Sequence, residues 1–436
     1  MGRHGEATRR RPICHIHMNE KETRGRGWRW VPSLYVFQGV PSCLVMTTSA
    51  MMYKDMGVSV ASFAFWTSAV CLPWSLKPLW APVVERYHTK RSWVLACQLC
   101  LAALLVGLGL SFLAGPMFYA LSLCLMLVVA MTSASHDIAC DGYYMMALSE
   151  REQSFFVGIR STFYRVAMVA STGLVPFVAG RVGASAGDAA VGWATALCGA
   201  GGALLLLFAL CRWGMPAVAE RRGRQDDGLR ILWRALRSFF SHPDAAATVT
   251  FFAVYRLGEA LLAKIVTPFL IDSREAGGIG LSVDQCGIVY GTFGVAALVL
   301  GGILGGVLSS RLGLRRTLWP MVALMNLPNL AYVALAHWQP AASSGMVAAA
   351  VVTEQFGYGF GFTAYMLVML RYVGDAEYKA AEYAIGTSIM SLSLLLPGMG
   401  AGWALEALGS YEALFVAACA LTLPGVVAAR QLTIDN

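Results

Sequence analysis

Residues 92–113 read SWVLACQLCLAALLVGLGLSFL, a stretch without one charged side chain. As a helix rising about 1.5 Å per residue, it is long enough to cross the roughly 30 Å hydrocarbon core of a bilayer. The whole chain shares this character, because 57% of its 436 residues are hydrophobic and 13% are charged. A typical soluble protein carries about 25% charged residues. The bilayer is therefore the solvent of this chain, and a soluble enzyme with one large core is excluded.

Similar apolar stretches recur along the chain and predict an all-α integral membrane protein with twelve transmembrane helices. The predicted spans are residues 31–53, 59–84, 92–113, 116–148, 154–180, 189–212, 245–270, 283–309, 316–337, 343–371, 380–403 and 411–430. A long basic stretch separates the first six spans from the last six, which indicates two six-helix bundles. The predicted regions are a basic N-terminal tail (1–30), an N-terminal bundle (31–212), a linker (213–244), a C-terminal bundle (245–430) and a short tail (431–436).

Charge distribution gives the orientation. With the N-terminus in the cytoplasm, the inside loops and tails hold 25 of the 33 Lys and Arg residues, and the outside loops hold Lys54, Arg181 and Arg274. Short cytoplasmic loops of membrane proteins are rich in Lys and Arg. Both termini are therefore predicted to be cytoplasmic. The net charge of +8 is explained by these loops, so nucleic-acid binding is not expected.

The two halves of the chain contain similar sequence segments at an offset of about 220 residues. Gly57-Val58-Ser59-Val60 precedes the second span as Gly280-Leu281-Ser282-Val283 precedes the eighth, and a basic loop follows each of these spans. Tyr35 in the first span has its counterpart in Tyr255 in the seventh. Such repeats are typical of transporters built from a duplicated bundle.

The N-terminal tail and the cysteines carry little functional signal. No cleavable signal peptide is expected, because the first thirty residues are basic and lack an apolar core; residues 1–17 differ from the rest, so Met18 is an alternative start to Met1. Cys97 and Cys100 lie inside a predicted span, where cysteine acts as a small packing residue. Cys14 and the two nearby histidines lack a fourth ligand, so we expect no metal site.

Ionisable residues within spans are costly and therefore mark functional candidates. The fourth span carries Asp137 and Asp141 on one helix face, and the fifth returns with Arg160 and Arg165. Counted from the turn near residue 151, Asp141 lies at the depth of Arg160, and Asp137 at that of Arg165. Two interpretations stay open: a structural or gating charge network, or direct contact of Arg165 or Asp137 with an anionic or protonated group.

The C-terminal half carries Arg256, Glu259 and Lys264 in the seventh span and Glu354 in the tenth. Arg256 and Glu259 can pair within one turn, while Lys264 points elsewhere and is expected to face a cavity. Glu354 lies near mid-depth with no cation in its own helix. It is a candidate for proton coupling or, alternatively, for a structural pair with Arg256 or Lys264.

The second span ends in LPWSLKPLWAP at residues 72–82, whose three prolines should kink the helix. Lys77 lies in this segment and either reaches the interface or lines the inner mouth of a cavity. Glycines such as Gly291 and Gly402 are expected to pack helices closely.

Several of these segments together resemble the AmpG-like branch of the major facilitator superfamily, and are similar to the acetyl-coenzyme A transporters of the same superfamily. The segments are residues 34–41 (LYVFQGVP), 57–59 (GVS), 72–82, 136–142 (HDIACDG) and 159–165 (IRSTFYR). The loop at residues 85–91 departs from the superfamily pattern because it lacks a central glycine.

The resemblance implies two six-helix bundles around a central cavity and an inner-membrane permease that imports anhydro-muropeptides, with protons as the coupling ion and no cofactor. The Arg and Lys residues within spans favour an anionic or sugar-peptide cargo, and the protein is expected to be monomeric. Alternatives are a carrier of the same fold for acetyl-coenzyme A, a siderophore or a drug, or a membrane sensor that moves no solute. An enzyme is not expected, because no nucleophile–base pair, metal cluster or phosphate loop is present in the sequence.

Overall fold

The computed structural model describes residues 27–81, 84, 87–148, 150–218, 228–374 and 379–432. Within these residues every regular element is a helix. The predicted tails, apart from residues 27–30 and 431–432, and residues 219–227 of the linker lie outside the described residues. The predicted all-α membrane fold is confirmed in the part of the chain that the structure describes.

The N-terminal half crosses the bundle six times, and several crossings consist of successive helical pieces. They are α2 (Val31–Cys43), η1 (Leu44–Thr48) and α3 (Ser49–Asp55); α4 (Val60–Val70), α5 (Leu72–Leu76) and η2 (Lys77–Leu79); α7 (Lys90–Ser111); η3 (Gly115–Met117) and α8 (Phe118–Ala147); α9 (Glu150–Val169), η4 (Ala170–Leu174) and α10 (Val175–Ala186); and α11 (Ala189–Gly214).

The linker contributes α12 (Gly228–Phe240), and the C-terminal half again crosses six times. Its elements are α13 (Ala245–Val254) and α14 (Leu257–Ile271); η5 (Arg274–Ala276), which lies in a loop; α15 (Val283–Cys286), η6 (Gly287–Gly294) and α16 (Val295–Leu312); α17 (Leu314–Asn326), η7 (Leu327–Asn329) and α18 (Leu330–Trp338); α19 (Gly345–Tyr372); α20 (Lys379–Leu408); and α21 (Tyr411–Ala420) and α22 (Leu423–Gln431).

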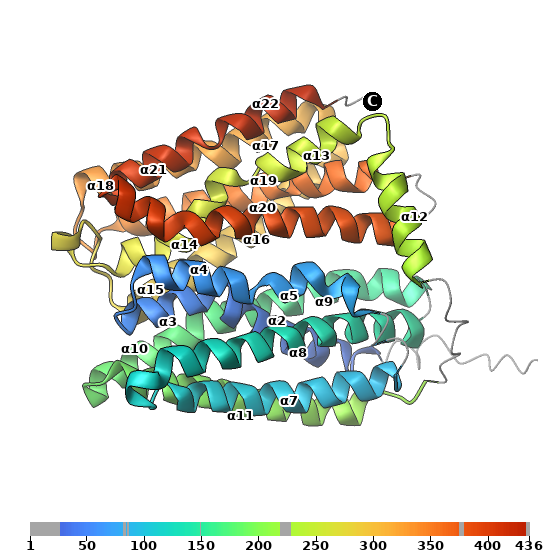
Figure 1. The fold of residues 1–436 in the computed structure, drawn as a ribbon, viewed down its shortest axis with the longest axis horizontal. Helices are drawn as coiled ribbons and strands as arrows, with labels where there is room; N and C mark the ends of the chain where they lie inside the picture. Colours follow the sequence, from blue (N-terminus) through green and yellow to red (C-terminus); the bar gives the residue numbers. More distant parts are fainter. Residues whose placement is uncertain are drawn as a thin grey trace, which may run out of the picture.

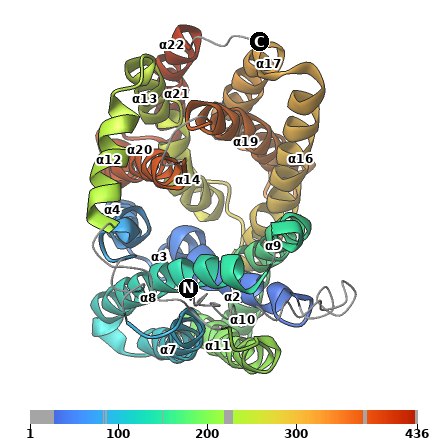
Figure 2. The same cartoon turned by 90° about the vertical axis from the view of Figure 1, so that its right-hand side faces the viewer.

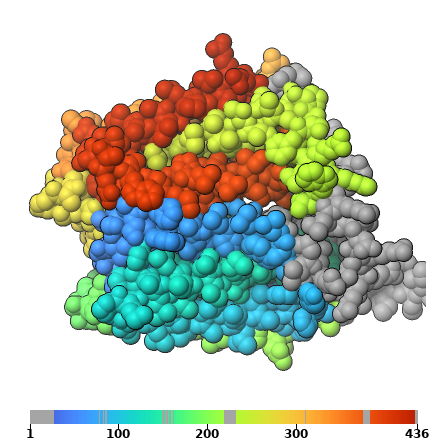
Figure 3. All heavy atoms as spheres, in the orientation of Figure 1, coloured from blue at the N-terminus to red at the C-terminus, as the bar shows by residue number. Residues whose placement is uncertain are grey.

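The two halves form two bundles that lie side by side. Figure 1 shows the blue-to-green helices of the N-terminal half on one side and the yellow-to-red helices of the C-terminal half on the other. Figure 2 looks along the helices and shows both bundles arranged around a central region. In Figure 3 the red α20 lies directly on the blue α4, two helices that also contact each other in the structure.

Eight of the crossings are long and apolar enough to span a membrane by their own composition. The remaining four are the first, second, seventh and tenth. The first two and the seventh are divided into short pieces, and α19 carries Glu354, Gln355 and a glycine-rich run that lower its mean hydropathy. All four of these less apolar crossings contribute residues to the cavity at the centre of the molecule.

Several predicted spans differ in detail from the structure, among them the second and the fifth. The second breaks at Cys71 and passes into a 3₁₀ turn at Lys77–Leu79, because Pro73 and Pro78 cannot donate the helical hydrogen bonds. The fifth is longer than predicted and continues to Ala186. Arg181 therefore lies on the last turns of α10 and not in a loop.

The two bundles approach each other closely at one end of the molecule, where α3 of the first crossing and α14 of the seventh crossing terminate. Lys54 Nζ lies 2.6 Å from an Asp272 carboxylate oxygen, and Arg181 Nε lies 3.2 Å from Asp284. Both of these ion pairs join the two bundles. At Gly291 an added Cβ would lie 1.8 Å from the carbonyl oxygen of Thr172 in the other bundle, so the two backbones approach closely only because this residue is glycine.

Candidate functional site

A cavity of about 650 Å³ lies between the two bundles. A cavity of this volume falls within the range of roughly 300–1,000 Å³ found for small-molecule sites. Its walls are mostly apolar side chains of both halves. The lining residues come from the first, second, fifth, seventh, eighth, tenth and eleventh crossings, and include Met46, Trp74, Met168, Tyr358, Phe362 and Met390.

Three cations reach this cavity: Arg165 from the N-terminal bundle, and Arg256 and Lys264 from the C-terminal bundle. Among the described residues that line it, none is Asp or Glu. Charges interact more strongly in a low-dielectric interior than in water. The cavity is therefore suited to an anionic ligand, with positive charge on two opposite walls.

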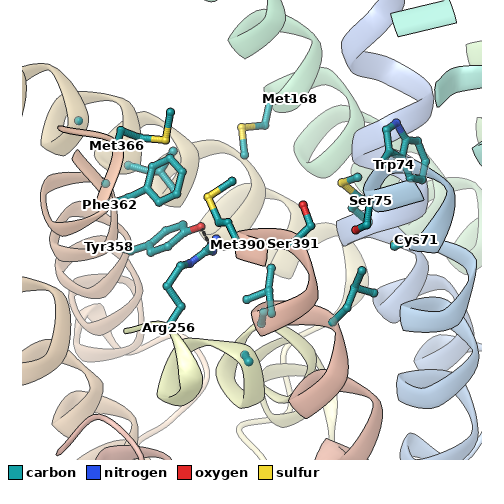
Figure 4. Close-up of a pocket in the computed structure, with 18 of the residues that line it drawn as sticks. Cys71, Trp74, Ser75, Met168, Arg256, Tyr358, Phe362, Met366, Met390 and Ser391 are labelled. Carbon is teal, nitrogen blue, oxygen red and sulfur yellow. Dashed lines mark hydrogen bonds between the residues drawn. The ribbon is translucent and has the colours of Figure 1, made fainter. Parts of the chain in front are cut away.

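Arg256 is placed by the break in the seventh crossing. It lies at the N-cap of α14, directly after α13 and Tyr255, where the backbone leaves the helical conformation. Its guanidinium donates a hydrogen bond to the Tyr358 hydroxyl, and its Cζ lies 5.3 Å from the Tyr358 ring centre and 5.1 Å from that of Phe362. Figure 4 shows Arg256 pointing at Tyr358, with Trp74 and Ser75 on the opposite side of the pocket. Contact with two rings holds the cation in one position.

Lys264 lies two turns further along α14 and is buried, with 8% of its surface exposed. Its ammonium donates a hydrogen bond of 3.0 Å to the Thr67 hydroxyl on α4. This bond joins the two bundles directly beside the cavity. Lys264 is one of the residues that line the cavity.

Asp137 and Arg165, which the sequence places at one depth, have different neighbours in the structure. The Asp137 carboxylate accepts a hydrogen bond of 2.9 Å from the Gln38 amide on α2, while Arg165 lines the cavity. Lys77 is the cation that interacts electrostatically with Asp137. Counting residues from the turn gives the depth of a side chain but not its direction around the helix axis, and the two side chains face different neighbours.

Asp141 and Arg160, predicted to lie at one depth, do meet. Arg160 Nη1 lies 3.6 Å from Asp141 Oδ1, and both side chains are partly exposed. The Arg160 guanidinium also lies 4.9 Å from the Tyr35 ring centre and 5.1 Å from that of Tyr144. None of these four residues lines the cavity.

Glu354 is buried, with 2% of its surface exposed, and lies behind the cavity wall. It accepts hydrogen bonds from the Tyr332 hydroxyl at 3.0 Å and from the Gln355 amide at 2.9 Å. Its hydrogen-bond donors are therefore neutral groups and not Arg256 or Lys264, the alternatives that the sequence left open. Glu259 on α14 is also buried and interacts electrostatically with both Glu354 and Arg256.

The sequence did not predict that Glu259 and Glu354 lie close together. The two residues are ninety-five positions apart, and their proximity depends on how their two spans pack. The aromatic side of the cavity could have been found. Tyr358 and Phe362 are four residues apart and share one face of α19, in a run where glycine alternates with aromatic residues. The glycines between the rings allow close helix packing, because an added Cβ at Gly357 or Gly359 would lie 2.0 Å from a carbonyl oxygen of a neighbouring helix.

No group of three or more His, Cys, Asp or Glu that could hold a metal ion occurs among the described residues. Of the predicted site residues, the structure brings Arg165, Arg256 and Lys264 together at the cavity. Glu259 and Glu354 lie behind it. Asp137, Lys77, Asp141 and Arg160 lie within the N-terminal bundle, away from the lining.

Comparison with known proteins agrees with this architecture. Residues 34–381 match the Major Facilitator Superfamily. The anhydromuropeptide permease of Escherichia coli strain K12 is 26% identical over 394 residues, covering 89% of this chain and 76% of the permease. An uncharacterized protein of Haemophilus influenzae is 27% identical, covering 89% of this chain and 90% of that protein. A putative transporter, AmpG 4, of Rickettsia conorii is 22% identical and covers 90% of this chain and 93% of its own length.

Solved structures of similar fold are also transporters. A bacterial homologue of the human lysosomal transporter Spinster, in an inward-facing and unoccupied conformation, superposes with a TM-score of 0.71 at 17% identity, covering 95% of this chain and 97% of that chain. A D-xylose-proton symporter superposes with a TM-score of 0.69 at 11% identity, covering 93% and 98%.

The fold and the central cavity define a multi-pass membrane transporter and not an enzyme. The chain belongs to the Major Facilitator Superfamily. Its similarity to AmpG-like permeases, predicted from the sequence motifs, is confirmed by these relatives.

Proposed function

We propose that this protein is a secondary active transporter that imports an organic anion, with an anhydro-muropeptide or related sugar-peptide as the best candidate cargo. The observation that carries the proposal is the cation content of the cavity. Arg165, Arg256 and Lys264 line it, and none of the described lining residues is acidic. Burying three cations is costly, and Glu259, which interacts with Arg256, lies behind the cavity wall, so an anionic cargo would supply the remaining negative charge.

The remainder of the wall fits a cargo that is both polar and bulky. A muropeptide joins a sugar to a short peptide with several carboxylates. Arginine binds carboxylates through two parallel hydrogen bonds. The Tyr358 and Phe362 rings and the Trp74 indole offer flat surfaces for the sugar. The E. coli relative, named an anhydromuropeptide permease, supports this choice of cargo.

Proton coupling is the second part of the proposal. Glu259 and Glu354 are buried near each other behind Arg256 and Tyr358. Like charges at close range in a low-dielectric region repel strongly, so such a pair is suited to hold a proton between them. A proton taken up by these carboxylates would change the electrostatic field at Arg256. It would therefore change the attraction between Arg256 and an anionic cargo.

The same cavity would also accept other large anions, such as acetyl-coenzyme A. The distinguishing experiment is a thermal-shift screen of the purified protein against muropeptides, coenzyme A esters and siderophores, followed by uptake in proteoliposomes. A ligand at 100 times its Kd stabilises the folded state by about 2.7 kcal/mol. We expect muropeptides to raise the melting temperature. A rise confined to coenzyme A esters would show that the cargo is a coenzyme A ester and not a muropeptide. Binding without uptake would indicate a sensor.

We further propose a monomer in the inner membrane with both termini in the cytoplasm. The bias of basic residues supports this orientation. A single cysteine placed at Gly223, in a background without native cysteines, should stay unlabelled by an impermeant thiol reagent in intact cells. Labelling at that position would contradict the orientation.

A further inference from the structure

The linker helix α12 (Gly228–Phe240) has one face packed on the protein and one face that none of the described elements covers. Ala235 and Phe239 are fully buried. The Tyr372 hydroxyl donates a hydrogen bond to the Phe239 carbonyl oxygen, and the two rings lie 4.9 Å apart edge to face. The helix is therefore docked on the ends of α19 and α20 and is not a loose tether.

The opposite face combines aromatic and basic side chains. Trp233 is 70% exposed and Phe240 is 54% exposed, and Arg237 is exposed between them. Positions 233, 237 and 240 fall at helical spacing on one stripe, turned away from Ala235 and Phe239. A tryptophan, an arginine and a phenylalanine on one stripe are typical of a helix that lies in the headgroup layer of a membrane.

The location of α12 agrees with such a role. In Figure 1 it runs across the ends of the crossings and not parallel to them. In the end view of Figure 2 it lies at the outer margin of the molecule, between α13 and α4 and away from the central region. The helix thus lies beside the bundles, where lipid would surround them, and not over the central region.

We propose that α12 is an interfacial helix that binds anionic phospholipids of the leaflet on the linker side. Arg237 contacts the phosphate headgroup, and Trp233 and Phe240 enter the boundary between headgroups and acyl chains. Phosphate is the complement of the arginine charge, and the two rings lose exposure to water only if hydrocarbon is beside them. This site is separate from the proposed cargo cavity and does not depend on the cargo.

The test measures lipid binding to the full-length protein in detergent by native mass spectrometry, with cardiolipin, phosphatidylglycerol and phosphatidylcholine as probes. One surface arginine contributes roughly a fivefold change in affinity for an anionic lipid. Arg237→Gln should therefore weaken cardiolipin and phosphatidylglycerol binding about fivefold. Trp233→Gln should weaken it as well, and phosphatidylcholine should bind poorly to every variant.

A matched control removes an exposed arginine elsewhere on the same end of the molecule. Arg316→Gln on α17 lowers the net charge equally but leaves α12 intact. It should change cardiolipin binding less than twofold. Equal losses in both variants, or none in Arg237→Gln, would overturn the proposal. The melting temperature of each variant in lipid-free detergent should match the wild type, which separates a lost lipid site from misfolding.

Discussion

Each bundle holds an arginine against two aromatic rings, but the two arginines have different partners. In the N-terminal bundle, Arg160 lies over Tyr35 and Tyr144 and pairs with the carboxylate of Asp141 at 3.6 Å. In the C-terminal bundle, Arg256 lies over two rings of α19 and donates to a neutral tyrosine hydroxyl at the cavity.

We propose that Arg160 is a structural charge and Arg256 a functional one. The positive charge of Arg160 is balanced by the carboxylate of Asp141 within the same bundle. Arg256 is held in place by two rings and a hydroxyl, and the carboxylate that interacts with it, Glu259, does not line the cavity, so its guanidinium still faces a ligand there. The carboxylates differ in parallel: Asp141 has a cation, whereas Glu354 has only neutral hydrogen-bond donors.

The sharpest test of this contrast replaces each arginine by glutamine. Arg256→Gln should lower the uptake rate about 100-fold, because losing a buried charged contact to a ligand costs roughly 2–5 kcal/mol. Arg160→Gln should retain most of the uptake and lower thermal stability instead. Uptake of labelled cargo into proteoliposomes and melting curves give the two readouts. Equal uptake losses in the two variants would break the contrast.

The next largest effect is expected when the buried carboxylate of Glu354 is replaced. Glu354→Gln should reduce proton-driven accumulation to the level reached without a pH gradient, while exchange of cargo down its own gradient continues. The physical reason is that an amide keeps the hydrogen bonds to Tyr332 and Gln355 but cannot carry a proton. Accumulation is measured at two external pH values, with Asp141→Asn as the matched control. A variant that still concentrates cargo with a normal pH response would remove Glu354 from the mechanism.

The smallest effect is expected within the N-terminal bundle. Because the Asp141–Arg160 pair is partly exposed, its coupling should be modest, about 0.5–1 kcal/mol. Asp141→Asn with Arg160→Gln should lose less stability than the sum of the two single changes, as measured by melting temperature. The same cycle on Asp137 and Arg165 should be additive, since Asp137 binds Gln38 instead. Additivity in the first cycle would show that the observed pair contributes nothing.

The fold followed from the sequence because apolar length and loop charge are properties of single segments. The predicted span 189–212 corresponds to α11 at Ala189–Gly214, and 411–430 to α21 and α22, which together run to Gln431. The prolines of the second span also predicted its irregularity, because the regular α-helix is interrupted near Pro73 and Pro78. Helix extension past the membrane boundary, as at Arg181, leaves no hydropathy signal.

The site was predicted less completely, for a geometric reason. Depth along a span can be counted, so Asp141 and Arg160 were matched correctly. The direction of a side chain around its helix depends on packing, so Asp137 and Arg165, placed at one depth, have different neighbours. The proximity of Glu259 to Glu354 depends on contact between α14 and α19, which no local pattern specifies.

The central claim is that this cavity recognises the negative charges of its cargo. The most direct measurement is uptake of a labelled anhydro-muropeptide by proteoliposomes in competition with two unlabelled analogues, one with free carboxylates and one with each carboxylate converted to an amide. The account predicts that the free acid competes and that the amide competes at least tenfold more weakly, since bonds from arginine to a charged group are about twice as strong as neutral ones. Equal competition by the amide would contradict the assignment of Arg165, Arg256 and Lys264 as the residues that select the cargo.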